Sequence, residues 1–275
     1  MAASSASGHV VVFDFDLSLI DVNSDTHVPA RLAPEVLDFV RSRARETPWT
    51  QLMAEACARM HALGVARAQV EDCLRAMPAA PELIAAVRAA AAAGARLHIV
   101  SDANEVFIGE FLRAHALGPL FASVHTNRAA WRADGLLEVA PFHEAAAPPH
   151  GCARCPPNLC KGLVMDALGL SAGSGAGGGA GAATAAAAAS VTYIGDGGGD
   201  LCPALRLGAR DLVLARGGFP LARALHAAEG APLLAVLVEW EDGRALAAAL
   251  RERLGIAPLQ AEAPEVGAAA PQVTF

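Results

Sequence analysis

The sequence predicts an α/β fold built on a mostly parallel sheet. Short apolar segments alternate with helix-like segments along the chain, a pattern typical of βαβ units. The expected strands are Val10–Phe13, Arg96–Val100, Phe121–His125, Val191–Ile194 and Asp211–Leu214. The expected helices between them include Ala80–Ala93, Glu105–Ala116 and Leu159–Leu168. At 275 residues the chain can bury a substantial core and still carry a smaller insert.

The gap between the first two expected strands is too long for a single crossover. It contains three helical patterns, at Pro34–Arg45, Thr50–Leu63 and Ala66–Ala76. We interpret residues 23–77 as a helical cap over the carboxyl edge of the sheet. The core would then comprise residues 1–22 and 78–256. The alternative is that these helices pack on the flank of the sheet as part of the core.

Two segments are low in complexity. Residues 171–190 are nearly all Gly and Ala, and residues 257–275 are rich in Ala and Pro. We predict a flexible insert and a disordered tail, because such compositions bury too little surface to order themselves. The insert also lacks the fixed glycine spacing and the Lys-Ser/Thr pair of a phosphate-binding P-loop.

The composition argues against several partners and locations. A net charge of −7 gives no basic footprint for nucleic acid and disfavours an anionic membrane surface. No stretch approaches about 18 strongly apolar residues, and Met1–Gly8 lacks the features of a signal peptide. We therefore expect a cytoplasmic protein, whose six cysteines are thiols or metal ligands rather than disulfides.

Asp14 and Asp16 directly follow the first expected strand, Val10–Phe13. In an open α/β sheet, ligands bind at the carboxyl ends of the strands. Two carboxylates there form a concentrated negative site, which is costly unless a cation or a reaction requires it. A Mg²⁺ ion and a nucleophilic carboxylate would both explain such a pair.

Three further polar motifs occur at later strand ends or helix starts. Ser101 follows the second expected strand, Lys161 opens a helix after Cys160, and Asp196 and Asp200 follow the strand Val191–Ile194. Each motif alone has an ordinary explanation, since a serine after a strand is often a helix cap and a lysine is usually solvated. Four such motifs in order are much harder to obtain by chance.

Together these motifs resemble the haloacid dehalogenase-like phosphatase superfamily, and most closely its phosphoethanolamine/phosphocholine phosphatase family. Plant members of that family have been named pyrophosphatases or thiamine phosphate phosphatases. The resemblance implies a Rossmann-like three-layer core with a small helical cap inserted after the first strand. The runs that carry it are Asp14-Phe15-Asp16, Asp21-x-Asn23-Ser24-Asp25, Ser101-Asp102-Ala103-Asn104, Cys152-x-x-Cys155-Pro156-x-Asn158-Leu159-Cys160-Lys161 and Gly195-Asp196-Gly197.

The resemblance also implies roles for individual residues. Asp14 would be the nucleophile that forms an aspartyl-phosphate, and Asp16 the general acid and base. Ser101 and Lys161 would bind the phosphoryl group and offset its charge. The implied Mg²⁺ ligands are Asp14, Asp16 through its backbone carbonyl, Asp196 and Asp200.

The expected partner is a small phosphorylated metabolite. By resemblance, Asp25 and Asp102 would face a cationic head group, as in phosphoethanolamine, phosphocholine or thiamine monophosphate. Pyridoxal phosphate is a further candidate substrate. Alternatively, the two aspartates only cap helices. Inorganic pyrophosphatase activity and a non-catalytic phosphometabolite-binding protein also stay open, and the sequence does not determine the oligomeric state.

A cysteine-rich segment precedes Lys161. His150, Cys152, Cys155 and Cys160 have the number and type of ligands for a closed structural zinc site. The alternative is that these thiols stiffen the loop by packing alone.

Overall fold

A computed structural model describes residues 6, 8–143, 150–172, 190–227 and 232–258. The predicted Gly/Ala-rich insert and C-terminal tail therefore lie largely outside the described residues. Seven strands form one sheet in the order β4-β3-β2-β1-β5-β6-β7, and every neighbouring pair is parallel except β3 and β4. The strands are β1 (His9–Phe13), β2 (Arg96–Asn104), β3 (Phe121–Trp131), β4 (Leu137–Ala140), β5 (Ser190–Gly195), β6 (Leu212–Arg216) and β7 (Val236–Trp240).

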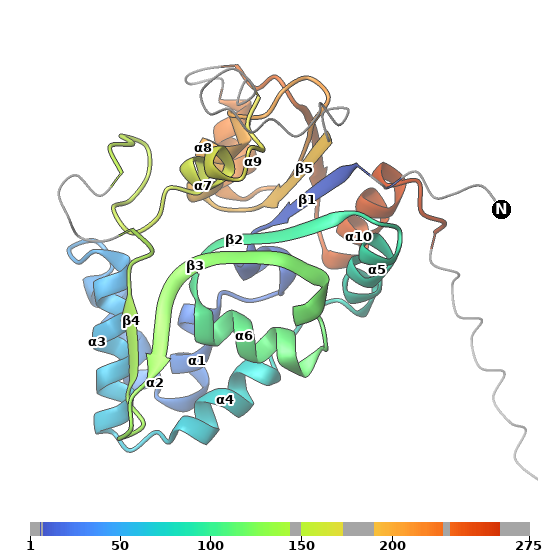
Figure 1. Cartoon of the computed structure of the whole chain (residues 1–275). Coiled ribbons are helices and arrows are strands. Elements are labelled where there is room, and N and C mark those ends of the chain that lie inside the picture. The colour runs from blue at the N-terminus through green and yellow to red at the C-terminus, as the bar shows by residue number, and fades with distance from the viewer. Residues whose placement is uncertain (1–5, 7, 144–149, 173–189, 228–231, 259–275) are drawn as a thin grey trace, which may run out of the picture.

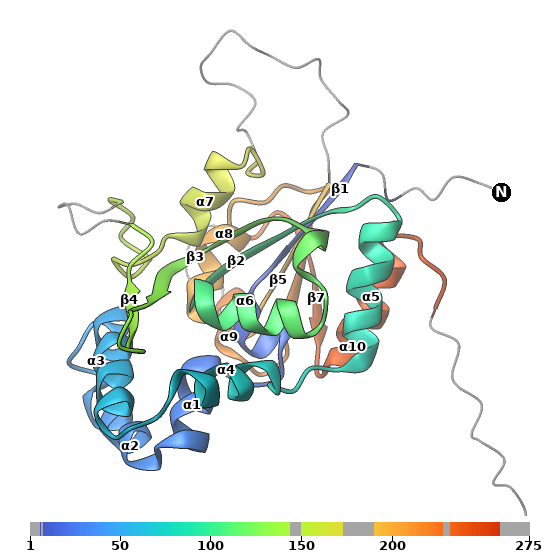
Figure 2. The same ribbon diagram turned by 60° about the horizontal axis from the view of Figure 1, so that its bottom comes forward.

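Helices cover both faces of this sheet, so the core has three layers (Figures 1 and 2). Along β1, Val11 and Phe13 face one apolar cluster, whereas Val10 and Val12 face another. The first cluster includes residues of α5 (Pro81–Ala92), α6 (Glu105–Ala114) and α10 (Gly243–Arg253). The second includes residues of α7 (Lys161–Ala167), α8 (Leu201–Ala204) and α9 (Pro220–His226). The predicted α/β fold is confirmed.

Four helices separate β1 from α5 and lie together in Figure 1. They are α1 (Ser24–Leu32), α2 (Pro34–Arg43), α3 (Trp49–Ala62) and α4 (Arg67–Arg75). Three correspond to the predicted patterns, whereas α1 was not predicted and contains Pro29. The side chains of Val28, Leu52 and Leu74 are fully buried in the same apolar cluster as α5 and α6. Treatment of residues 23–77 as a separate cap stays a prediction.

The strand predicted at Phe121–His125 is longer in the structure. It continues as β3 to Trp131 and returns antiparallel as β4, with Arg128 opposite Ala140. This hairpin reaches beyond the core sheet and runs beside α3 (Figure 1). The sequence did not reveal it because its residues alternate between exposed and partly buried positions rather than forming an apolar run.

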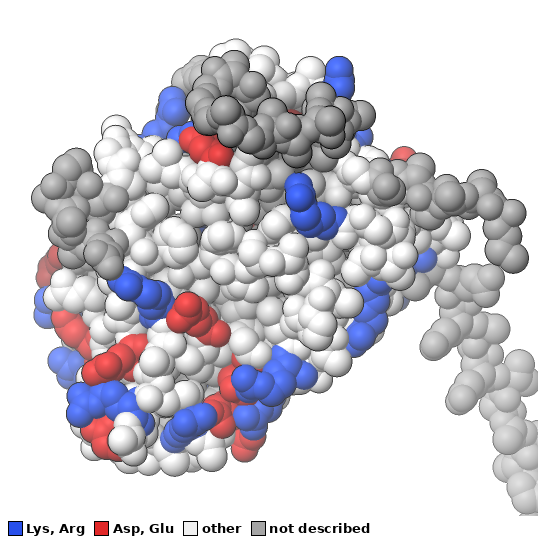
Figure 3. Space-filling model, viewed as in Figure 1, with Lys and Arg blue, Asp and Glu red and all other residues white. Residues whose placement is uncertain are grey.

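Charged side chains of both signs are interspersed on the face shown in Figure 3, and many lie over the helices between β1 and α5. Ion pairs within those helices, such as Arg67 with Glu71 and Arg75 with Asp72, contribute to this mixture. None of the described helices is long and apolar enough to cross a membrane.

Candidate functional site

The candidate site lies where the strand order changes direction. The chain proceeds from β1 to β2 and β3 on one side, and to β5, β6 and β7 on the other. Such a switch point opens a crevice at the carboxyl ends of parallel strands. Asp14 follows β1, Ser101 lies near the end of β2, and Asp196 follows β5. The backbone N–H of Asp14 donates to the carbonyl of Ile194 over 2.9 Å, which joins the ends of β1 and β5.

The two predicted catalytic carboxylates lie at the start of one tight turn. Asp14 is 4% exposed, and its Oδ1 accepts a 2.7 Å hydrogen bond from the N–H of Phe15. Burial, with repulsion from Asp200, raises the pKa of Asp14 well above its usual range. Asp16 Oδ1 accepts a 2.9 Å hydrogen bond from the N–H of Ser24. Burial and the neighbouring Asp25 raise the pKa of Asp16 to about 8.

The same turn contains a strained backbone position. Leu17 has a φ of 55°, a left-handed conformation that is uncommon for residues other than glycine. Arg216 Nη1 donates to the Leu17 carbonyl over 2.8 Å, and its guanidinium lies over the rings of Phe219 and Trp240. Arg216 therefore ties the end of β6 to the turn that carries Asp14 and Asp16. Sequence reasoning missed Arg216, because no motif around it indicates that its side chain binds the carbonyl of Leu17, which is 199 residues away.

Lys161 is the only lysine in the chain, and its side chain is 3% exposed. Its Nζ lies 3.0 Å from Asp14 Oδ2, 2.8 Å from Asp200 Oδ1 and 3.8 Å from Asp102 Oδ1. Burial alone would lower the pKa of Lys161, but the charges of Asp14 and Asp200 outweigh it and raise this pKa well above its usual range. The structure thus brings Lys161 to the carboxylates as predicted.

Asp200 is fully buried and accepts hydrogen bonds from four donors. Its Oδ1 accepts from Lys161 Nζ and, over 2.6 Å, from the hydroxyl of Tyr193. Its Oδ2 accepts from the backbone N–H groups of Asp196 and Gly197, at 3.1 and 2.9 Å. These four bonds use about all the acceptor positions of a carboxylate. Tyr193, the only tyrosine in the chain, was not predicted.

A divalent cation fits the carboxylates of this site. Carboxylate oxygens of Asp14, Asp196 and Asp200 all lie within 4.8 Å of one another, and oxygen is the ligand that Mg²⁺ prefers. Burial and repulsion from Asp200 raise the pKa of Asp196 to about 7, which reflects the excess of negative charge. The side chain of Asp16 is not in this group, and the use of its backbone carbonyl as a Mg²⁺ ligand stays a prediction.

The Ser101–Asn104 segment is the third segment that contributes residues to the candidate site, after the Asp14 turn and the Asp196 loop. In this segment the pairing of β2 with β3 shifts register. Ser101 is fully buried, whereas Asp102 has a side chain that is 47% exposed. Asn127 holds this segment, because its Nδ2 donates to the carbonyls of Asp102 and Ala103 over 2.6 and 3.0 Å. Asn127, too, was missed. It is a polar residue in the middle of β3, and its position in the sequence does not indicate that it contacts Asp102 and Ala103.

Asp25 and Asp102 do not cap helices. The cap of α1 is Asn23, whose Oδ1 accepts from the N–H of Thr26 over 3.1 Å, and the cap of α6 is Asn104. That alternative interpretation is wrong. Asp25 is 5% exposed, and its Oδ2 accepts a 2.6 Å hydrogen bond from Trp49 Nε1. Burial raises the pKa of Asp25 to about 7.

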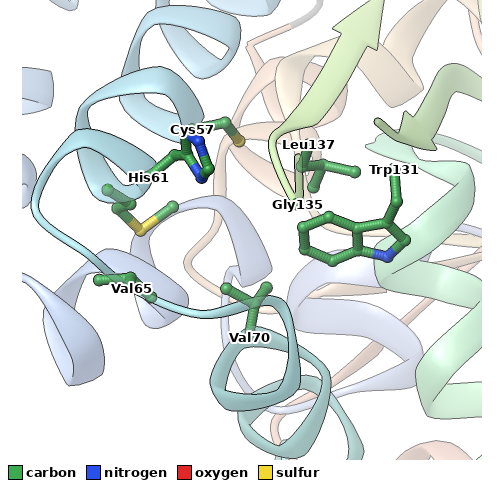
Figure 4. A pocket seen from close by; sticks show the side chains of 8 residues that line it. Cys57, His61, Val65, Val70, Trp131, Gly135 and Leu137 are labelled. Carbon is green, nitrogen blue, oxygen red and sulfur yellow. The ribbon is translucent and has the colours of Figure 1, made fainter. Parts of the chain in front are cut away.

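Asp25 borders a small, mainly apolar pocket between the inserted helices and the core. Its lining comes from α1, α3, the end of β2, α6 and β4: Asp25, Pro29, Met53, Ala56, Cys57, Met60, Asn104, Phe107 and Val139. A second pocket shares Cys57 and Met60 and lies between α3, α4 and the β3–β4 hairpin (Figure 4). None of the predicted catalytic residues lines the second pocket, which also includes Val70, Trp131 and Leu137.

The structure corrects the predicted cysteine site. The thiols of Cys152, Cys155 and Cys160 are grouped with that of Cys202 at the start of α8, and all four sulfur atoms lie within 4.8 Å of one another. His150 is not part of this group. Its Nε2 lies 2.9 Å from the Pro156 carbonyl oxygen, and its Nδ1 accepts from the N–H of Cys152 over 3.1 Å. Both ring nitrogens are therefore already engaged.

Comparisons with known proteins give consistent matches. The model of the family described as Putative Phosphatase matches residues 9–254. A thiamine phosphate phosphatase-like protein of Arabidopsis thaliana is 38% identical over 77% of this chain and 82% of its own length. The human phosphoethanolamine/phosphocholine phosphatase is 30% identical over 88% of this chain and 87% of its own. A phosphoserine phosphatase structure in the apo form superposes with a TM-score of 0.53 at 15% identity, covering 90% of this chain and 98% of that one.

Proposed function

The chain belongs to the Putative Phosphatase family and is a phosphatase, and we propose that it hydrolyses small phosphomonoesters through a phosphoryl intermediate on Asp14. The observation that carries this proposal is the position of Lys161. One buried ammonium group lies 3.0 Å from the carboxylate of Asp14, and Asp16 follows two residues later on the same turn. Positioning and charge compensation are most of what phosphoryl transfer requires of a protein.

The two carboxyl groups have different roles: Asp14 is the nucleophile, and Asp16 transfers protons. In the first step an oxygen of Asp14 bonds to phosphorus, the ester P–O bond breaks, and the proton of Asp16 passes to the leaving oxygen. In the second step Asp16 takes a proton from water, the water oxygen bonds to phosphorus, and the bond between Asp14 and phosphorus breaks. A pKa of about 8 leaves Asp16 protonated at neutral pH, as the first step requires.

Mg²⁺ would be held by Asp14 and Asp196, with the backbone carbonyl of Asp16, and would supply positive charge to the phosphoryl oxygens. The four hydrogen bonds to Asp200 suit it better to positioning. It orients the Lys161 ammonium and the loop that carries Asp196. Ser101, fully buried at the end of β2, would contribute a hydroxyl group to phosphoryl binding.

For the substrate, we propose a phosphomonoester with a cationic head group. Asp25 provides a buried carboxyl group between the inserted helices and the core, and the half-exposed Asp102 lies near enough to raise the pKa of Asp25. The positive charge of a quaternary ammonium or a thiazolium ring would offset the negative charge of these two carboxylates. Pyrophosphate would bring a second anion toward Asp25. This disfavours the pyrophosphatase alternative, although inorganic pyrophosphatase 2 of Arabidopsis thaliana is 34% identical to this chain.

The test is phosphate release, with Mg²⁺ present, from phosphoethanolamine, phosphocholine, thiamine monophosphate, pyridoxal phosphate and pyrophosphate. Wild type is compared with Asp14→Asn and with Asp38→Asn, a control on an exposed side chain of α2 outside the sequence motifs. We expect a preferred cationic substrate, no turnover by Asp14→Asn, and normal turnover by the control. Acid quenching of wild type should leave phosphate on the peptide that contains Asp14. Activity that is low on every substrate and unaffected by Asp14→Asn would favour the binding-protein alternative.

A further inference from the structure

Four thiols from two separate segments converge on one point. Cys152, Cys155 and Cys160 come from the loop before α7, whereas Cys202 comes from α8, more than forty residues later. The sulfur of Cys202 lies 3.8 Å from the sulfur of Cys152 and 3.8 Å from that of Cys160. The described part of the chain shows all six of its cysteines as free thiols.

These distances are those of tetrahedral zinc coordination. With a metal–sulfur distance of about 2.3 Å, two ligands of a regular tetrahedron are about 3.8 Å apart. A disulfide would need sulfur atoms about 2.05 Å apart, and no pair in this cluster approaches that distance. The cluster also holds four sulfur ligands and no carboxylate, a donor set that favours zinc over magnesium or calcium.

A cation lies beside one of the four sulfurs. The Arg206 side chain and the Cys202 sulfur are neighbours, because a Cβ atom at Gly162 would lie 2.3 Å from Arg206 Nε and 2.6 Å from that sulfur. A cation next to a ligand sulfur offsets the negative charge that the sulfur carries when it binds a metal.

We propose that these four cysteines bind one zinc ion in a closed structural site. The inference does not depend on the proposed phosphatase substrate. It differs from the site expected from sequence, because Cys202 replaces His150 as the fourth ligand. Both segments that supply the cysteines also carry a residue of the candidate active site. Cys160 directly precedes Lys161, and Cys202 follows Asp200 by two residues.

The ion would therefore clamp the segment that carries Lys161 to the segment that carries Asp200. These two side chains meet over 2.8 Å and are nearly inaccessible to solvent. Gly162, next to Lys161, confirms how closely the segments approach. A Cβ atom there would lie 2.6 Å from the Cys202 sulfur. Four metal–sulfur bonds would hold this approach in addition to the apolar cluster that α7 and α8 share.

The first experiment is metal analysis of the full chain after dialysis against EDTA, which strips weakly bound Mg²⁺. We expect about one zinc per chain to remain, and to be released in proportion as a mercurial reagent titrates the thiols. Removal of zinc should make four additional thiols reactive toward a thiol reagent. Replacement of zinc by Co²⁺ should give the intense absorption of tetrahedral thiolate coordination. These measurements need no variant, so a folding defect cannot obscure them.

Three variants then identify the ligands. Cys202→Ser should lower the zinc content at least tenfold, whereas His150→Ala and Cys73→Ser should keep about one zinc per chain. Cys73 is the matched control, because it is a thiol on α4 outside the cluster. The proposal is overturned if wild type retains no zinc, if iron is the retained metal, or if His150→Ala loses zinc while Cys202→Ser keeps it.

Discussion

The Lys161 ammonium lies 2.8 Å from Oδ1 of Asp200, and both side chains are at most 3% exposed. The same ammonium lies 3.0 Å from Oδ2 of Asp14, so one cation bridges two buried carboxylates. Removing one partner of such a group leaves an uncompensated buried charge, which is strongly unfavourable.

Lys161→Met should lower kcat by about a hundredfold to a thousandfold, the usual loss when one preorganised charge or donor is removed from a transition state. The Mg²⁺ concentration for half-maximal activity should not rise, because the variant makes the site more negative. Lys161→Arg should also be impaired, since a planar guanidinium does not fit the volume of an ammonium in a closed site. Steady-state kinetics across a Mg²⁺ titration checks this. A Lys161→Met enzyme with normal kcat would contradict the role.

Tyr193→Phe should destabilise the protein by about 1.5–3 kcal/mol, the range for a hydrogen bond to a charged group. The lost hydroxyl donates to Asp200 Oδ1 over 2.6 Å in a fully buried setting. Its loss leaves Asp200 with three donors and a less well oriented Lys161, so kcat should fall while KM changes little. Urea unfolding and kinetics measure the two effects. Equal stability of the variant and wild type would contradict this account of Asp200.

The KM for a cationic substrate should fall as the pH rises through about 7. Burial raises the pKa of Asp25 to about 7, so its carboxylate becomes available to a cation only above that pH. Asp25→Asn should raise the KM for phosphocholine and remove this pH dependence. Glycerol phosphate is the control substrate, because it has the same titrating phosphate and no cation. A similar pH profile for both substrates in wild type would contradict a role of Asp25 in cation binding.

Stability should decrease as the pH falls below 6.5, and His98 should account for part of the loss. Burial lowers the pKa of His98 from 6.5 to about 4, so the unfolded chain takes up a proton at a higher pH than the folded chain. The stability that neutral His98 provides is present above pH 6.5 and is lost between pH 6.5 and about 4. Between pH 7 and pH 5 this amounts to about 1–2 kcal/mol.

Urea unfolding of wild type and His98→Gln at both pH values measures this contribution. The variant should lose less stability on acidification, because a glutamine does not titrate. An identical pH dependence in His98→Gln and wild type would show that other groups carry the effect.

The sequence alone predicted the α/β class and the residues at strand ends. Alternation of apolar runs with helical patterns is a local property, and so is the placement of Asp14, Ser101 and Asp196 directly after such runs. Once the strands are known to be parallel, their carboxyl ends must share an edge of the sheet, which brings these residues together. This is why the motifs of the candidate site could be identified from the sequence without coordinates.

Only the tertiary structure decided which distant groups complete the site. Tyr193 and Asn127 sit within strands, Arg216 at the end of one, and their partners depend on strand register and side-chain direction. The same holds for Cys202, which meets the other thiols because α8 packs against α7, and for His150, which neighbouring backbone groups engage. The spacing of residues along the chain indicates only which residues are in contact within one helix, strand or turn. Contacts between elements depend on how those elements pack, which no local pattern records.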